Sequence, residues 1–151
     1  MRILGLDVGD RTIGVAVSDP LGITAQSLTT LKRSTLEKDL QSLGKIIKEW
    51  EIDEIVVGLP LNMNGTMGPQ GKKALSFREK LEKATNLSTV FWDERLSTVA
   101  AEKILLEADL SRAKRKKNID KTAAAIILQN FLEARQQRKI TFDKGSGVSY
   151  D

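Results

Sequence analysis

The alternation of apolar and polar residues predicts a β-hairpin at the start of the chain. Residues 2–6 (RILGL) form a short apolar run, and residues 13–17 (IGVAV) form a second one. Residues 9–12 (GDRT) lie between them and are of the types that favour tight turns. Gly5 and Gly14 weaken the two strands, so we expect another backbone or a ligand to approach closely there.

Strand and helix patterns alternate over the next forty or so residues. A third strand is expected at about residues 26–31. Ser34 and Glu37 have the spacing of a capping box, and the apolar residues that follow recur at helical spacing to about Glu51. Residues 54–58 (EIVVG) are short, β-branched and followed by Pro, which is typical of a buried strand.

The second half of the chain continues this alternation. Residues 60–71 (PLNMNGTMGPQG) indicate a long loop, and residues 72–84 have a helical pattern. Residues 89–93 (TVFWD) predict the last strand. A helix is expected from Ser97 or Thr98 to about residue 107, and a final helix from Ile119 to about Arg138, after a basic loop. The apolar face of the final helix is expected to hold Ile119, Ala123, Ile126, Ile127, Asn130 and Phe131.

This order of elements predicts a single α/β domain. A hairpin followed by strand–helix–strand units implies a mixed sheet with helices on both faces. We expect the domain to span residues 1–138 and residues 139–151 to form a flexible tail.

Composition restricts the chemistry that the chain can perform. It has no His and no Cys, which excludes imidazole catalysis, disulfides and thiolate metal sites. No apolar run approaches the length of a membrane span and no signal-peptide layout is seen, so a cytoplasmic protein is expected. Any reaction must therefore use carboxylates, hydroxyls, Lys, Arg or backbone groups.

Charge is distributed unevenly along the chain. Residues 1–110 hold 14 Lys or Arg and 16 Asp or Glu, whereas residues 111–151 hold ten and four, a net charge of +6. Such asymmetry favours a polyanionic partner. A solvated basic surface or a loose tail explains it equally well.

Three acidic positions are candidates for a catalytic site. Asp7 closes the first strand, at the end of an α/β sheet where ligands gather, although a structural turn aspartate is an alternative. Asp93 and Glu94 close the last strand, and alternation allows only one of them to share a site with Asp7. Asp120 lies in the first turn of the final helix. Its negative charge can either interact favourably with the helix dipole, a structural role, or point towards the sheet. Spacing alone does not choose between Asp93 and Glu94.

Converging carboxylates without histidine suit oxygen coordination of Mg²⁺ or Mn²⁺. Two such ions can assist phosphodiester hydrolysis. Residues 112–117 (RAKRKK) precede Asp120 and are suited to bind phosphates without sequence preference, unless they form only a solvated loop. The candidate nucleic-acid-binding residues are Arg11, Arg95, Arg112, Lys114, Arg115, Lys116 and Lys117.

Four motifs in order resemble the bacterial YqgF (RuvX) family. They are GLDVGDRTIGVAVSD at residues 5–19, VGLP at 57–60 with NG at 64–65, DERLST at 93–98, and KK at 116–117 leading to the acid and alanines of the final helix. Together the motifs cover about residues 2–135. No departure from the family pattern occurs at these motifs.

The resemblance implies an RNase H-like fold, a mixed five-stranded sheet flanked by helices, related to Holliday junction resolvases. It implies a nuclease that matures the 5′ end of the small-subunit ribosomal RNA precursor (pre-16S rRNA). The family's catalytic and metal-binding acids match Asp7, Glu94 and Asp120, which favours Glu94 over Asp93. The glycine-rich loop and the basic run are then expected to hold nucleic acid.

Several alternatives stay open. Resolvase-like ancestry also suits four-way DNA junctions, although no apolar stripe indicates the dimer that such an enzyme needs, so a monomer or weak homodimer is expected. A non-catalytic module that binds RNA or the assembling small ribosomal subunit is also compatible with the acids. The hairpin at residues 7–14 also resembles the phosphate-binding turn of actin-like sugar kinases, which need a second domain for which 151 residues leave no room.

Overall fold

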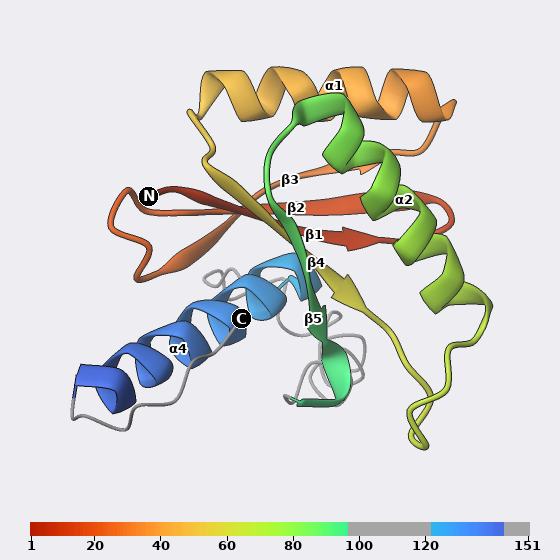
Figure 1. The fold of residues 1–151 in the computed structure, drawn as a ribbon. Helices are drawn as coiled ribbons and strands as arrows, with labels where there is room; N and C mark the ends of the chain where they lie inside the picture. The colour runs from red at the N-terminus through yellow and green to blue at the C-terminus, as the bar shows by residue number, and fades with distance from the viewer. Residues whose placement is uncertain (97–121, 144–151) are drawn as a thin grey trace, which may run out of the picture.

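The computed structural model describes residues 1–96 and 122–143, in which five strands form one mixed sheet (Figure 1). The strands lie in the order β3-β2-β1-β4-β5. Their bounds are β1 Ile3–Val8, β2 Thr12–Ser18, β3 Ala25–Lys32, β4 Glu54–Leu59 and β5 Thr89–Asp93. The helices are α1 Leu36–Glu49, α2 Pro69–Thr85, the 3₁₀ turn η1 Glu94–Leu96 and α4 Ala123–Asp143. The expected hairpin, the strands and their order along the chain are confirmed.

The sheet joins an antiparallel half to a parallel half. β1 pairs antiparallel with β2, and β2 with β3, whereas β1, β4 and β5 run parallel. Helices α1 and α2 cover one face and α4 covers the other (Figure 1). Because β1, β4 and β5 run in the same direction, their carboxyl ends meet at one edge of the sheet, which is where the candidate acids lie.

The two faces of the sheet carry side chains of different size. On the α1 and α2 face, Leu6, Val15, Val57 and similar residues pack with Leu43 and Phe77 into the larger core cluster. The face towards α4 carries glycine where the helix comes nearest. A Cβ atom at Gly5 would lie 2.7 Å from the Cβ of Leu128 and 3.3 Å from the carbonyl oxygen of Ala124. The expected close approach is therefore confirmed at Gly5, where α4 supplies it, whereas a Cβ atom at Gly14 would lie an ordinary 3.5 Å from the Cβ of Ala124.

An ion pair fixes the second half of α4 to the sheet. The two terminal nitrogens of Arg135 donate to the two carboxylate oxygens of Glu54, at 2.7 and 2.9 Å. Glu54 is 9% exposed, and the guanidinium of Arg135 also lies 4.6 Å from the ring centre of Phe131. A two-point contact of this kind fixes orientation as well as distance.

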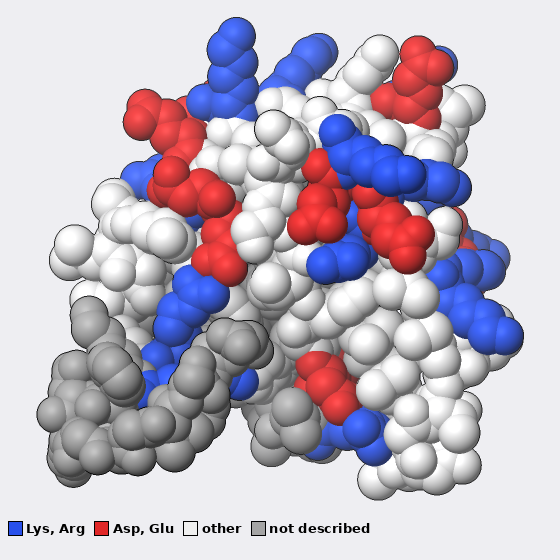
Figure 2. Space-filling model, in the orientation of Figure 1, with Lys and Arg blue, Asp and Glu red and all other residues white. Residues whose placement is uncertain are grey.

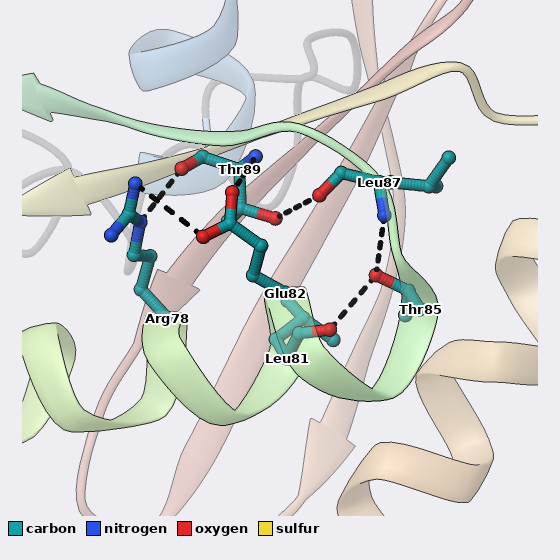
Figure 3. Close-up of polar contacts among 6 residues, drawn as sticks. All are labelled: Arg78, Leu81, Glu82, Thr85, Leu87 and Thr89. Carbon is teal, nitrogen blue, oxygen red and sulfur yellow. Dashed lines mark hydrogen bonds and ion pairs between the residues drawn. The ribbon is translucent and has the colours of Figure 1, made fainter.

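Polar contacts at the end of α2 set the start of β5 (Figure 3). Arg78 donates to the carbonyl oxygen of Thr89 at 2.7 Å, and the backbone N–H of Thr89 donates to Glu82 at 3.3 Å. Thr85 bonds back to Leu81 and accepts from the N–H of Leu87. These contacts fix the first residue of β5, and therefore the register that carries its last residues to the site.

Two predicted boundaries in the first half are wrong. Ser34 was expected to be the N-cap of α1, but the N-cap is the next residue, Thr35. The hydroxyl of Thr35 accepts from the N–H of Lys38 at 3.1 Å. The N–H of Ser34 instead donates to Asp39, a residue held by Arg33 at 2.8 Å. Helix α2 begins at Pro69, so the loop after β4 is shorter than residues 60–71, because Pro suits the first turn of a helix.

The limits and the buried face of the last helix also differ from the prediction. Helix α4 begins at Ala123 rather than Ile119, since the hydroxyl of Thr122 accepts from the N–H of Ala125, and it runs on to Asp143. Asn130 is only half buried, and the face against the sheet is set by Gly5, which selects Ala124 and Leu128. The buried residues of α4 are Ala124, Ala125, Ile126, Ile127, Leu128, Phe131 and Leu132. Residues 144–151 of the expected tail lie outside the described residues.

Within the described residues, no helix combines the length and apolar character needed to cross a bilayer.

Replacing Gly5 with alanine is expected to destabilise the fold, because the new methyl group would overlap Leu128. We expect Gly5→Ala to lower the free energy of unfolding by about 1–3 kcal/mol, measured by urea denaturation. Gly44, inside α1, has nothing within 4 Å of a Cβ atom and is the matched control. Gly44→Ala is expected to raise stability by about 0.5–1 kcal/mol. Equal effects of the two substitutions would contradict the close approach of α4.

Candidate active site

Asp7 lies on the face of the sheet that α4 covers, next to two positions without side chains. It alternates along β1 with Gly5, which faces α4, and it pairs across the sheet with Gly14 of β2. Leu6 pairs with Val57 on the other side, which brings Gly58 of β4 beside Asp7. The half-buried Asp7 is thus bordered by glycine on both neighbouring strands, so neither strand places a side chain against it on this face.

Glu94 reaches the same place from β5. A Cβ atom on Gly58 would lie 2.8 Å from a carboxylate oxygen of Glu94 and 2.5 Å from the Cδ1 of Ile127 in α4. The Glu94 side chain therefore covers Gly58, on the α4 face, and is 7% exposed. Asp7 and Glu94 approach Gly58 from the strands on either side, so the structure brings these two predicted acids together.

Asp93 points away from this pair and has a different partner. Arg95 donates to Asp93 through its side chain at 2.8 and 3.2 Å and through its backbone N–H at 2.9 Å. The hydrogen bond from Arg95 holds the pKa of the Asp93 carboxyl below its ordinary value of 3.8. Of the two acids, Glu94 lies over Gly58, beside Asp7, whereas Asp93 forms a local ion pair.

The predicted basic residues are placed differently from one another. Arg11 is exposed in the turn between β1 and β2, close in sequence to Asp7, and its carbonyl oxygen accepts from the N–H of Arg33. Arg95 is paired with Asp93 and touches the carbonyl oxygen of Met63 at 3.4 Å. Asp120 and the basic residues Arg112, Lys114, Arg115, Lys116 and Lys117 lie outside the described residues.

The loop between β4 and α2 is held in a defined shape beside the site. Its backbone closes through Asn62 and Thr66 at 2.9 Å, and through Gly65 and Asn62 at 2.8 Å. Gly65 has a φ of +88°, which favours glycine, and it packs on the guanidinium of Arg95. Arg95 therefore links this loop to the residue that follows Glu94.

Acidic and basic side chains alternate over the described surface. Figure 2 shows both signs side by side over α1 and α2 on the face in view. Asp10, for example, is exposed and accepts from Lys73 at 2.8 Å and Gln70 at 3.0 Å, contacts that hold its pKa below 3.8. The turn role expected for Asp10 is thus a link from the hairpin to α2.

The donor set of the pair fits a hard cation. Asp7 and Glu94 offer only carboxylate oxygens, the ligands that Mg²⁺ and Mn²⁺ prefer. Among residues 1–96 and 122–143 no cluster of three possible metal ligands occurs. The third predicted acid, Asp120, is not among those residues.

Sequence reasoning missed the role of Gly58. Its neighbours Glu94 and Ile127 come from distant parts of the chain, so spacing along the sequence does not indicate them. The signal that was available is a glycine at the end of an otherwise β-branched strand, a pattern that marks close approach.

Comparison with known proteins gives one family and a group of closely similar relatives. The family model described as "RuvX: Holliday junction resolvase" matches residues 1–134. A protein of Desulforamulus reducens named "Putative pre-16S rRNA nuclease" is 60% identical over 89% of this chain and 98% of its own length. Proteins of the same name from Clostridium botulinum and Thermoanaerobacter pseudethanolicus are 59% and 56% identical, over 88% and 91% of this chain and 97% and 100% of their own lengths.

Solved structures show the same fold at low sequence identity. RuvC of Thermus thermophilus, in complex with a Holliday junction substrate, has a TM-score of 0.59 at 14% identity and covers 91% of this chain and 96% of its own. A second Thermus thermophilus RuvC structure has a TM-score of 0.56 at 13% identity, over 91% of this chain and 97% of its own. The expected RNase H-like α/β fold, with its mixed five-stranded sheet, is confirmed.

Removing Arg95 is expected to raise the pKa of Asp93 towards 3.8, because the guanidinium is the main group that lowers it. Since the folded-state pKa is depressed, the pair stabilises the fold above the pKa of the unfolded chain. This contribution is lost as the pH falls through the depressed pKa. Arg95→Gln should thus reduce stability by less than about 1 kcal/mol at neutral pH, and not at all once Asp93 is protonated. Carboxyl NMR titration and urea unfolding measure the two effects; an unchanged Asp93 titration would contradict the pairing.

Proposed function

Since this chain belongs to the RuvX family, we propose that it is a metal-dependent endonuclease that cleaves phosphodiester bonds of structured RNA, and that its substrate is pre-16S rRNA. The proposed substrate rests on the sequence identity of 56–60% between this chain and proteins named as putative pre-16S rRNA nucleases, over nearly their whole lengths. The assembling small ribosomal subunit in the cytoplasm is the corresponding partner.

The arrangement of Asp7 and Glu94 supports the proposed chemistry. With no histidine in the chain, carboxylates are the groups available to hold a cation, and these two approach Gly58 from either side. Asp7, Glu94 and Asp120 would hold Mg²⁺ or Mn²⁺, which when bound stabilises negative charge on the phosphate under attack.

The basic residues supply binding rather than chemistry in this proposal. Arg11 lies at the same end of the hairpin as Asp7 and is exposed. Residues 112–117 precede Asp120 in sequence and carry five positive charges. Such residues contact phosphates irrespective of base, so they would position the RNA backbone over the acids.

A Holliday junction resolvase is the second candidate function. It is favoured by the description of the family itself. The structural similarity to RuvC supports the fold only, so the choice between RNA and junction DNA needs a direct test. A non-catalytic RNA-binding module is the third outcome that the experiment must separate.

We expect Asp7→Asn to abolish metal-dependent cleavage while RNA binding is kept or improved, since the change removes repulsion towards phosphate. A loss of at least about 100-fold is expected, the size of effect produced by removing one charge-stabilising group. Glu94→Gln and Asp120→Asn should behave alike. The assay uses a labelled pre-16S rRNA leader and a four-way DNA junction, each with Mg²⁺, Mn²⁺ or EDTA.

Asp10→Asn is the matched control for this test. Asp10 lies on the same hairpin, is exposed and pairs with Lys73, so its variant should cleave at the normal rate. Cleavage of the junction alone would favour the resolvase. Binding of the leader without cleavage by any variant would favour the non-catalytic module, and normal cleavage by Asp7→Asn would mean that the acids are wrongly assigned.

Charge reversal in the basic run is expected to weaken binding without a direct effect on chemistry. We expect Lys116→Glu with Lys117→Glu to reduce RNA affinity and to lower the slope of log affinity against log salt by about 0.7 for each phosphate that the variant no longer neutralises. The control is Lys45→Glu with Lys48→Glu, an equal change on the exposed side of α1. Fluorescence anisotropy at several salt concentrations gives both slopes, and equal slopes would remove residues 116–117 from the RNA-binding surface.

A further inference from the structure

The loop after β4 presents one side chain that the fold does not use. Met63 is 90% exposed, the highest value among the large apolar residues in the described part of the chain. Single exposed apolar residues are common on protein surfaces and by themselves mean little. What distinguishes Met63 is the ordered loop that carries it and the place where that loop lies.

Hydrogen bonds hold the loop in the shape that keeps Met63 outside. Asn62 and Thr66 close its base through both backbone and side chains, and Asn64 accepts from the N–H and the hydroxyl of Thr66. Met63 therefore sits at the tip of a tight turn, between Asn62 and Gly65. Because the turn is formed before any ligand arrives, placing this side chain against a partner costs little further conformational entropy.

The other methionine of the same loop behaves in the opposite way. Met67 folds back onto α2, where a Cβ atom on Gly71 would lie 2.6 Å from its Cγ. The loop thus packs one methionine, half buried, against the following helix and leaves the second exposed. The exposure of Met63 is a property of its position in the turn and not of the loop as a whole.

The loop is joined directly to the candidate active site. It begins after Gly58, which Glu94 covers, and Figure 1 shows it projecting beyond the carboxyl end of β4. Its tip is held by Arg95, which donates to the carbonyl oxygen of Met63 and contacts Gly65, while Asp93 fixes the guanidinium at 2.8 Å. Asp93 and Arg95 therefore hold the loop in place, whereas Glu94, which lies between them in the sequence, belongs to the acidic site.

We propose that Met63 is a wedge that separates stacked bases of the RNA where a double-stranded segment meets a single strand, next to the phosphate to be cleaved. Apolar side chains, methionine and leucine among them, are inserted between base steps by DNA-binding proteins, where they replace a neighbouring base without requiring a hydrogen bond. Structured RNA differs from a continuous duplex in having such junctions. The inference rests on the proposed function and specifies which feature of the RNA the site selects.

The test measures base unstacking apart from cleavage. An RNA hairpin with a single-stranded extension carries 2-aminopurine at the junction, and the Asp7→Asn background keeps the RNA intact. Binding should raise the fluorescence of 2-aminopurine, and Met63→Ala should abolish most of that rise. We expect junction affinity to fall about five- to tenfold and the affinity for a fully paired duplex to be unchanged.

Two further variants control for general effects of the substitution. Leu21→Ala removes another exposed apolar side chain, 78% exposed in the turn between β2 and β3 at the other end of the strands, and should leave the signal unchanged. Met63→Leu keeps an apolar side chain of similar size and should retain the signal.

The outcomes separate the wedge from the nuclease. A full fluorescence rise with Met63→Ala, in a protein whose wild type cleaves the RNA, would overturn the wedge and leave the function standing. An absence of cleavage by the wild type would overturn the proposed function itself. Loss of the signal in Met63→Ala together with its retention in Met63→Leu would support the wedge, and cleavage of the same RNA by the wild type would support the nuclease.

Discussion

The close packing of α4 on the sheet is the constraint on which the rest of this structure depends. It requires a floor of small residues, and Gly5 and Gly58 provide it where Leu128 and Ile127 come nearest. The same floor lets the Glu94 side chain lie over Gly58, beside Asp7, at the carboxyl end of β1 and β4. The packing that stabilises the domain and the proximity of the two acids therefore depend on the same face of the sheet.

Asp93, the last residue of β5, and the first two residues of η1 serve two purposes. Glu94 lies over Gly58 at the acidic site, whereas Asp93 is bound by Arg95. The contacts of Arg78 and Glu82 with Thr89, at the beginning of the same strand, set the register on which this division depends. A shift of one residue would exchange the roles of the two acids.

Much of the fold and part of the site were predictable from the sequence. The hairpin, the parallel strands and the close approach at Gly5 follow from local patterns, because strand periodicity and glycine placement are short-range signals. The N-cap at Thr35 and the face of α4 were mispredicted, since these depend on which hydroxyl reaches an N–H and which residues meet the sheet. The choice of Glu94 over Asp93 needed the family resemblance, because periodicity does not say which face of β5 meets α4.

The glycine floor also affects how related sequences should be interpreted. A side chain at Gly5 would collide with the Cβ of Leu128 and crowd the backbone of α4, whatever reaction the protein performs. A descendant that had lost its catalytic acids would therefore still retain Gly5, as long as it kept the helix in place. In a set of homologues, position 5 would trace the inheritance of the architecture, and positions 7 and 94 would trace the inheritance of the chemistry.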